Sequence, residues 1–335
     1  MIGVAVVLGA RVPILTTDGN ARLGRRRHLH DRHSRLCGDQ AELAAHGQSK
    51  RLLVNGTVII WSHCQRLYSW RMPSDSAAQA VLLDIDGVLH VGDAPIAGAT
   101  QALAELRELS AGVRLLTNTT SKSRRQIVEQ LQQLGFDLDM HEVLTPAALA
   151  VRHCQEQGHR SVALLVGEAL REDLLELTQA PSGAAVDAVV LGDLGDGFTA
   201  EVLNGAFRQL MDGAQLVALQ HNRYWQRGDG LALDVGAYSA ALEYGAATEP
   251  VIVGKPAPGF FRAALADLDA LPNRAVMVGD DIEADVGGAL ACGLRGILVR
   301  TGKYREELVG ASAVQPSEVV NSIADVPLLL RQLQG

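Results

Sequence analysis

The chain contains few cysteines and no long apolar run, and each absence excludes a class of protein. Four cysteines are scattered over the 335 residues, at Cys37, Cys64, Cys154 and Cys292, which is not the dense framework of a disulfide-bonded secreted domain. No apolar stretch is long enough to cross a bilayer, and the run at residues 2–8 is short and lacks a basic region before it, unlike a secretory signal. We therefore expect a protein of the reducing cytoplasm with no membrane partner.

The chain also lacks an excess of positive charge. Its 30 lysines and arginines against 38 aspartates and glutamates give a formal net charge of −8, which argues against nucleic acid as a substrate. The charge is divided unevenly, because residues 1–75 carry 11 basic and 5 acidic side chains. The acidic remainder is long enough for a core domain and a second domain.

The most informative segment is the apolar run at residues 81–83 that leads into Asp84, Ile85, Asp86 and Gly87. Side chains alternate along a strand, so Asp84 and Asp86 would point the same way, and Gly87 would let the chain turn at the carboxyl edge of a sheet. Ligands of open α/β sheets bind at that edge. Two adjacent carboxylates repel each other there unless a cation lies between them or one holds a proton. The segment therefore implies a metal, although an ordinary turn is the alternative when it is read alone.

Polar residues follow three further apolar runs in the same way. They are Thr117 and Asn118 after residues 113–116, Lys255 after residues 251–253, and Asp280, Asp281, Glu283 and Asp285 after residues 275–278. A helix predicted over residues 121–134 would make the first of these an anion site or an ordinary Ser/Thr cap. A solvated lysine and an acidic helix start are the corresponding ordinary readings of the others. Four such sites in a consistent order are harder to explain as accidents.

The four motifs match, one by one, the signature of the haloacid dehalogenase-like hydrolase superfamily, which the chain resembles from about residue 81 to residue 304. It is especially similar to the branch with a cap inserted between the second and third motifs. That branch contains phospholysine/phosphohistidine/inorganic pyrophosphate phosphatase and uncharacterised hydrolase-domain relatives. The closer match is carried by residues 116–120, 231–236, 241–244, 253–256, 278–281, 286–289 and 299–304.

The resemblance implies an α/β fold with two domains. A Rossmann-like parallel-sheet core would be built from residues 76–146 and 236–335, with an inserted α/β cap of the C2 type over residues 147–235. Within the cap, β-rich runs at 162–166, 188–191 and 215–219 and a helical stretch at 200–211 agree with an α/β pattern.

The resemblance also implies a phosphatase that acts through an aspartyl-phosphate. Asp84 would attack phosphorus, and Asp86 would protonate the leaving oxygen and then take a proton from the attacking water. Thr117 and the amide of Asn118 would hold the phosphoryl oxygens, while Lys255 would offset negative charge as the transition state forms.

The cofactor implied by the resemblance is Mg²⁺, which prefers a few hard oxygen ligands and keeps several waters. Its protein ligands would be the carboxylate of Asp84, the backbone carbonyl of Asp86 and the carboxylate of Asp280. Asp281 and Asp285 would be outer-shell groups, or one of them would ligate directly. The sequence leaves that choice open.

Asp86 also bears on the substrate, because the phospholysine-type members of the group carry Ser at its position. A hydroxyl cannot act as general acid and base, so Ser suits leaving groups that need less protonation, such as phosphoramidates or pyrophosphate. Asp86 favours phosphomonoesters, and dehalogenation is disfavoured because it does not use a paired carboxylate with a cation. Two alternatives stay open: a phosphoramidate or pyrophosphate hydrolase, and a non-catalytic binding or regulatory protein, against which the four retained motifs speak.

The cap is long enough to close over the phosphate edge and exclude water, which argues for small phosphorylated substrates. Its segment 222–228 joins cations and aromatics, and we predict that Arg223, Tyr224 and Trp225 contact the leaving group. The alternative is a loop whose aromatics pack on the cap while the arginines face water. Caps of this kind can form homodimers, although no interface signature is found in the sequence.

Residues 1–75 are expected to lie outside the functional protein. The basic run at 25–33 could indicate nucleic acid or a metal, but such runs are weak signals, and Cys37 and Cys64 give no ordered zinc-ligand spacing. Met72 stands nine residues before the run that leads to Asp84, which is where the resembling family begins. We predict an unstructured extension or a mis-set start, with the functional protein beginning at Met72. Peptides from before Met72 at full stoichiometry in the natively expressed protein would contradict a mis-set start.

Overall fold

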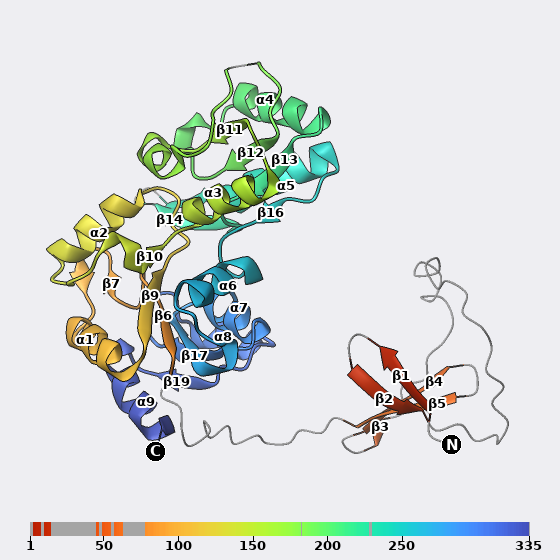
Figure 1. Ribbon diagram of the computed structural model, residues 1–335, viewed down its shortest axis with the longest axis vertical. Coiled ribbons are helices and arrows are strands. Elements are labelled where there is room, and N and C mark those ends of the chain that lie inside the picture. Colours follow the sequence, from red (N-terminus) through yellow and green to blue (C-terminus); the bar gives the residue numbers. More distant parts are fainter. Residues whose placement is uncertain are drawn as a thin grey trace. The chain divides into compact units, whose positions relative to one another are not determined.

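The computed structural model describes residues 78–181, 183–227 and 230–334, and before them only strands (Figure 1). The chain divides into two units, Met1–Trp70 and Arg71–Gly335. In the first unit, β1 (Gly3–Val7) pairs antiparallel with β2 (Ala10–Ile14). A second antiparallel sheet contains β3 (Ala45–His46), β4 (Ser49–Val54) and β5 (Thr57–Ser62).

These strands lie in the stretch for which the sequence predicts no structure. Their segments are rich in Val and Ile, which favour strands. The basic run at 25–33, Cys37 and Cys64 lie outside the described residues. The exclusion of residues 1–75 from the functional protein, and its start at Met72, stay predictions.

The core of the second unit is a parallel sheet of order β10-β9-β6-β17-β18-β19. Its central strands are β6 (Ala80–Asp84), β9 (Gly112–Leu116) and β17 (Ala275–Gly279), and the others are β10 (Val143–Leu144), β18 (Arg295–Val299) and β19 (Glu318–Val320). Every residue of β6 and of β17 is buried, as expected for parallel strands covered on both faces. The predicted α/β class is confirmed.

Alternate residues of β6 pack on helices of opposite faces. Val81 and Leu83 belong to the apolar cluster of α1 (Ala99–Leu109), α2 (Arg124–Gln133) and α9 (Val326–Gln334). Leu82 belongs to the cluster that contains Phe260 and Phe261 of α6 (Pro258–Asp267), and α7 (Gly288–Ala291) packs beside α6. Both phenylalanines are fully buried, and each contributes about 1.5–3 kcal/mol to folding. The short helix α8 is Glu306–Ala311, and a small hairpin joins β7 (His90–Val91) to β8 (Ala94–Pro95).

The inserted domain has its own parallel sheet of order β11-β12-β13-β16, above the core in Figure 1. Its strands are β11 (Val162–Leu165), β12 (Ala188–Leu191), β13 (Gln215–Ala218) and β16 (Val251–Ile252). The helices α4 (Ala200–Met211) and α5 (Val235–Ala246) cover one face, and α3 (Pro146–Gln157) contributes to the cluster on the other. The predicted inserted α/β cap is therefore present.

The boundary at which the chain returns to the core differs from the prediction. Residues from 236 onward were assigned to the core, yet α5 packs on α4 and β13, and β16 pairs with β13 in the cap sheet. By sheet membership the return follows Ile252. The reason is that a short apolar run such as 251–253 does not say which sheet it joins.

The segment predicted as a loop at 222–228 also differs. It forms β14 (Tyr224–Arg227), which pairs antiparallel with β15 (Gly230–Leu233). A turn between two short strands gives the same sequence signals as a longer loop. None of the helices in the described part of the chain is long and apolar enough to span a bilayer.

Candidate active site

Three carboxylates meet at the carboxyl edge of the core sheet. Asp84 ends β6, Asp280 directly follows β17, and Asp285 lies on the helical turn Ile282–Gly287. Because β6 and β17 are parallel neighbours, their carboxyl ends lie side by side. All three residues are buried, and each offers an oxygen within 4.8 Å of the oxygens of the other two.

Glycines make room for this carboxylate set, which we define as Asp84, Asp280 and Asp285. Gly87 has a φ of 83°, and a Cβ atom built there would overlap the Asp280 carboxylate. A Cβ on Gly279 would overlap the Asp285 carboxylate in the same way. The turn predicted at Gly87 therefore depends on glycine twice, for its backbone conformation and for its lack of a side chain.

Lys255 joins two members of the carboxylate set. Its Nζ lies 2.6 Å from Asp84 Oδ1 and 2.7 Å from Asp285 Oδ1, and all three side chains are buried. Burial alone would lower the pKa of the ammonium, but the charges of Asp285 and Asp84 outweigh it and raise that pKa. Lys255 is therefore a permanent cation beneath the nucleophile candidate.

Asn118 fixes the backbone of Lys255. The Lys255 N–H donates to Asn118 Oδ1 at 2.8 Å, and Asn118 Nδ2 donates to the Lys255 carbonyl at 2.7 Å. Thr117, buried at the end of β9, accepts a hydrogen bond from the Thr119 N–H at 3.0 Å. The structure thus brings both predicted phosphate-binding residues to the edge that holds Asp84.

The start of α2 is capped, as the ordinary reading of that segment predicts. Ser123 and Gln126 form a capping box, and the Arg124 N–H donates to Asp173 Oδ2 at 2.7 Å. The Ser123 hydroxyl and the Asp173 carboxylate therefore accept from two of the first amides of the helix, those of Gln126 and Arg124. Protein acceptors thus occupy part of the first turn of α2, and the predicted phosphate-binding residues at the sheet edge are Thr117, Asn118 and Lys255.

The carboxylate set is short of positive charge. Burial and the neighbouring charge of Asp84 both raise the pKa of Asp280 and the pKa of Asp285. Asp280 Oδ2 accepts a hydrogen bond from the Lys303 N–H at 2.7 Å, whereas Asp280 Oδ1 is buried without a hydrogen-bond partner among the described residues. Oxygen donors crowded in this way fit a hard divalent cation such as Mg²⁺.

Asp281 and Asp285 have different surroundings. Asp281 Oδ1 accepts from the N–H groups of Glu283 and Ala284, at 3.1 and 3.0 Å, and so caps the turn that follows. Asp285 stands in the carboxylate set. Of the two residues whose roles the sequence left open, Asp285 lies with the candidate ligands, and Asp281 beside them.

Asp86 lies outside the carboxylate set. Its side chain is 62% exposed, and its Oδ1 is 3.6 Å from Nε2 of the buried His90. An exposed carboxyl two residues after Asp84 is accessible to a group that arrives from solvent. The structure leaves its predicted proton-transfer role as a prediction.

Lys303 is a residue of this region that the sequence analysis did not single out. Its side chain is 59% exposed, and partial desolvation would lower the pKa of its ammonium, but the charges of Asp84, Asp281, Asp280 and Asp285 outweigh it and raise that pKa. The available signal was its place just after β18, since it follows an apolar strand as the four motifs do. The 299–304 run was used only for resemblance.

The predicted cap residues lie on the hairpin. Tyr224 and Trp225 of β14 are 58% and 42% exposed, and the Arg223 carbonyl accepts a hydrogen bond from the Asp234 N–H at 3.2 Å. Their contact with a leaving group stays a prediction.

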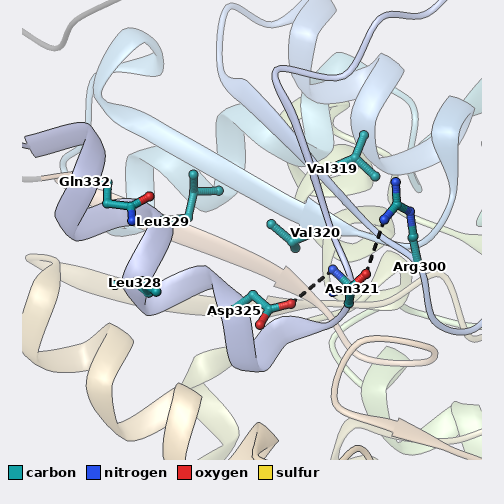
Figure 2. Close-up of a pocket in the computed structure, with 8 residues that line it drawn as sticks. All are labelled: Arg300, Val319, Val320, Asn321, Asp325, Leu328, Leu329 and Gln332. Carbon is teal, nitrogen blue, oxygen red and sulfur yellow. Dashed lines mark hydrogen bonds between the residues drawn. The ribbon is translucent and has the colours of Figure 1, made fainter.

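A separate cavity of about 290 Å³ lies between β19 and α9 (Figure 2). Figure 2 shows Arg300 donating to Asn321, at 3.2 Å, and Asn321 joined to Asp325. None of the predicted site residues lines this cavity. The carboxylate set therefore remains the candidate site.

Two family descriptions match the chain. Residues 81–178 match haloacid dehalogenase-like hydrolase, and residues 252–326 match HAD-hydrolase-like. The mouse haloacid dehalogenase-like hydrolase domain-containing protein 2 is 43% identical over 234 residues, which is 70% of this chain and 88% of that protein.

Two further similarities have phosphatase names. The rat phospholysine phosphohistidine inorganic pyrophosphate phosphatase is 40% identical over 265 residues, 77% of this chain and 96% of that protein. Among solved structures, the p-nitrophenyl phosphatase from Archaeoglobus fulgidus superimposes with a TM-score of 0.71 at 27% identity, over 75% of this chain and 99% of that one.

Proposed function

Because the chain belongs to the haloacid dehalogenase-like hydrolases, we propose that it is a Mg²⁺-dependent phosphatase that hydrolyses small phosphorylated metabolites through an aspartyl-phosphate. The observation that carries this proposal is the buried carboxylate set with Lys255 held between Asp84 and Asp285. Three buried carboxylates are costly unless cations neutralise them, and a divalent cation beside Lys255 would do so.

In the first step, Asp84 attacks phosphorus while the bond from phosphorus to the leaving oxygen breaks. Lys255 holds the attacking carboxylate by its Oδ1. Asp86 gives its proton to the leaving oxygen, so the product leaves as an alcohol. In the second step, water attacks phosphorus and gives a proton to Asp86, while the bond from phosphorus to the Asp84 oxygen breaks. Inorganic phosphate and the free Asp84 carboxylate are released.

Thr117 and Asn118 bind the phosphoryl oxygens during both steps. Their positions at the end of β9, beside the end of β6, support this role, and the two hydrogen bonds between Asn118 and Lys255 keep the phosphate-binding and cationic groups in register. Positioning and charge neutralisation account for most of the catalysis of phosphoryl transfer.

Mg²⁺ would be held by Asp84 and Asp280, with Asp285 and the backbone carbonyl of Asp86 as further oxygen donors. When bound, it supplies positive charge that balances the carboxylates and the phosphoryl group. The unpartnered Asp280 Oδ1 supports this assignment.

A phosphoramidate or pyrophosphate hydrolase is the second candidate, favoured by the name of the rat relative. Asp86 speaks for phosphomonoesters instead, because a general acid is most useful for a poor leaving group such as an alkoxide. A non-catalytic protein on the same fold is the third candidate.

Parallel assays of an aryl phosphate, a sugar phosphate, phospholysine and pyrophosphate, each with Mg²⁺ and with EDTA, test the proposal. We expect Mg²⁺-dependent turnover with the esters preferred. Preference for phospholysine or pyrophosphate would select the second candidate, and absence of turnover on a broad phosphometabolite panel would favour the third.

A further inference from the structure

The loop after β18 is held against the turn that carries Asp84 and Asp86. The Thr301 hydroxyl donates to the Gly87 carbonyl, and a Cβ on Gly302 would lie 2.5 Å from the Gly87 Cα. The next residue, Lys303, donates its N–H to Asp280 Oδ2 at 2.7 Å. The backbone of Lys303 is therefore fixed at the carboxylate set by contacts on two sides.

The side chain of Lys303 reaches solvent although its backbone is fixed. It is 59% exposed, and its Nζ lies 3.6 Å from Asp281 Oδ2, itself partly exposed. An ion pair at this distance in contact with water holds its partners weakly. Because a lysine has a flexible four-carbon stem, its ammonium can turn from Asp281 toward a group bound at Asp84 while the loop stays in place.

The ammonium of the buried Lys255 is already engaged by protein oxygens. An ammonium has three N–H donors. Lys255 Nζ lies 2.6 Å from Asp84 Oδ1, 2.7 Å from Asp285 Oδ1 and 3.5 Å from the Leu116 carbonyl. Lys255 therefore offers charge to a phosphoryl group on Asp84, but its ammonium already donates to Asp84 and to the Leu116 carbonyl and is ion-paired with Asp285.

We propose that Lys303 binds the phosphoryl group of the substrate, donating a hydrogen bond to one of its oxygens from the exposed side of Asp84. This inference rests on the proposed function and adds a substrate-contacting residue outside the four motifs. Lys255 acts from the buried side and Lys303 from the solvent side, so the incoming dianion meets a cation before it reaches the nucleophile. A hydrogen bond between two charged groups is stronger than a neutral one.

The test is the binding of inorganic phosphate to the full chain in the presence of Mg²⁺, measured by titration calorimetry, which needs no turnover. Lys303→Met is expected to weaken binding about tenfold, as the loss of one charge-assisted hydrogen bond does. Lys303→Arg keeps the charge and is expected to bind within about threefold of wild type, since it retains a donor of similar reach.

Arg305→Met is the matched control, because it removes a positive charge from the same loop. The Arg305 guanidinium donates to the carbonyls of Gly302 and Tyr304, at 3.0 and 2.6 Å. Its loss is expected to leave phosphate binding unchanged. Lys303→Gln provides a second neutral variant if Lys303→Met lowers the melting temperature.

Wild-type phosphate binding by both neutral variants would overturn the inference. An equal loss in Lys303→Arg would also overturn it, since the lysine would then act by ordering Asp280 and Asp281 rather than by its charge. If the wild-type chain binds phosphate through Lys303 but turns over no substrate, the proposed function fails and the binding role stands. If the wild-type chain turns over substrate but the neutral Lys303 variants bind phosphate as it does, the binding role of Lys303 fails and the proposed function stands.

Discussion

The carboxyl edge of the core sheet and the β14–β15 hairpin of the cap both carry predicted site residues, yet they are built differently. At the core edge Asp84, Asp280 and Lys255 are buried, and contacts of 2.6–2.7 Å join each of them to a neighbour. On the hairpin Tyr224 and Trp225 are largely exposed. Asp84 and Asp280 are thus fixed by the core sheet and Lys255 by its contact with Asp84, while the residues proposed for substrate choice lie where a change leaves the core undisturbed.

The cap and the core touch at the start of α2, away from the hairpin. Asp173, from the cap segment Glu168–Leu174, accepts the Arg124 N–H, and the neighbouring Glu172 pairs with Arg125 at 3.2 Å. The cap therefore supplies part of the capping of a core helix. This contact gives a way to perturb the cap while the carboxylate set stays intact.

Removing the Lys255 ammonium should have the largest combined effect on turnover and stability of any change at the core edge that leaves Asp84 in place. Lys255→Met leaves Asp84 and Asp285 buried without their cation, and losing one partner of a buried ion pair destabilises by about 3–5 kcal/mol. We expect turnover of an aryl phosphate to fall on the order of 10³-fold, together with the melting temperature. Lys122→Met, whose ammonium donates to Gln130 on the exposed side of α2, is the control. Wild-type turnover in Lys255→Met would contradict the assigned role.

Asp86→Asn tests whether an exposed residue of the core takes part in catalysis. The amide cannot give or take the proton, and loss of a general acid costs about 10²–10⁴-fold in rate. We expect the loss to be larger for a sugar phosphate than for an aryl phosphate, whose leaving group needs less protonation. Stability should hardly change, since the side chain is 62% exposed. Equal losses on both substrates would argue against proton transfer by Asp86.

Comparing Gly87→Ala with Gly92→Ala distinguishes the effect of a positive φ from the effect of a side chain placed against the carboxylate set. Gly87 and Gly92 both have positive φ angles, 83° and 57°, but a Cβ on Gly92 would meet no atom within 4 Å. Both alanine variants should lose about 1–2 kcal/mol of stability. Only Gly87→Ala should also displace Asp280, with about 10²-fold lower turnover and weaker Mg²⁺ binding by calorimetry. Equal behaviour of the two variants would show that the close approach to Asp280 is unimportant.

The smallest expected effect comes from the cap contact. Asp173→Ala removes the acceptor of the Arg124 N–H, a capping loss of about 0.5–2 kcal/mol confined to the first turn of α2. We expect faster hydrogen exchange at the Arg124 amide and a KM raised about threefold by a less firmly placed cap, with kcat unchanged. Glu176→Ala, which loses only a contact with Gln155 inside the cap, is the control. A drop in kcat with an unchanged KM would place the effect in the core instead.

The sequence could place several polar residues at the core edge because they lie at the end of a strand or directly after it. Asp84, Thr117 and Asp280 are the last residues of core strands or stand next to them, so a local pattern carries their position. Lys255 follows β16, which pairs with the cap sheet, and its place beside Asp84 comes from the linker and from Asn118. The sequence predicts the Lys255 motif from its residue types and does not predict which sheet the preceding strand joins.

What the sequence could not predict depends on contacts between distant segments. Pairing of β16 with β13 involves residues more than thirty positions apart, and a short apolar run favours neither sheet. The capping of Arg124 by Asp173 crosses two domains, and the approach of Lys303 to Asp280 follows from the loop after another strand. Such contacts are set by tertiary packing, which local patterns do not encode.

The covalent transfer of a phosphoryl group to Asp84 is the central claim and is open to direct measurement. The full chain with Mg²⁺ would be mixed rapidly with an aryl phosphate, quenched in acid during turnover and analysed by peptide mass spectrometry. We predict one added phosphoryl group on the peptide that contains Asp84, and neither that adduct nor turnover in Asp84→Asn. Turnover that persists in Asp84→Asn, or an adduct on another peptide, would contradict the account.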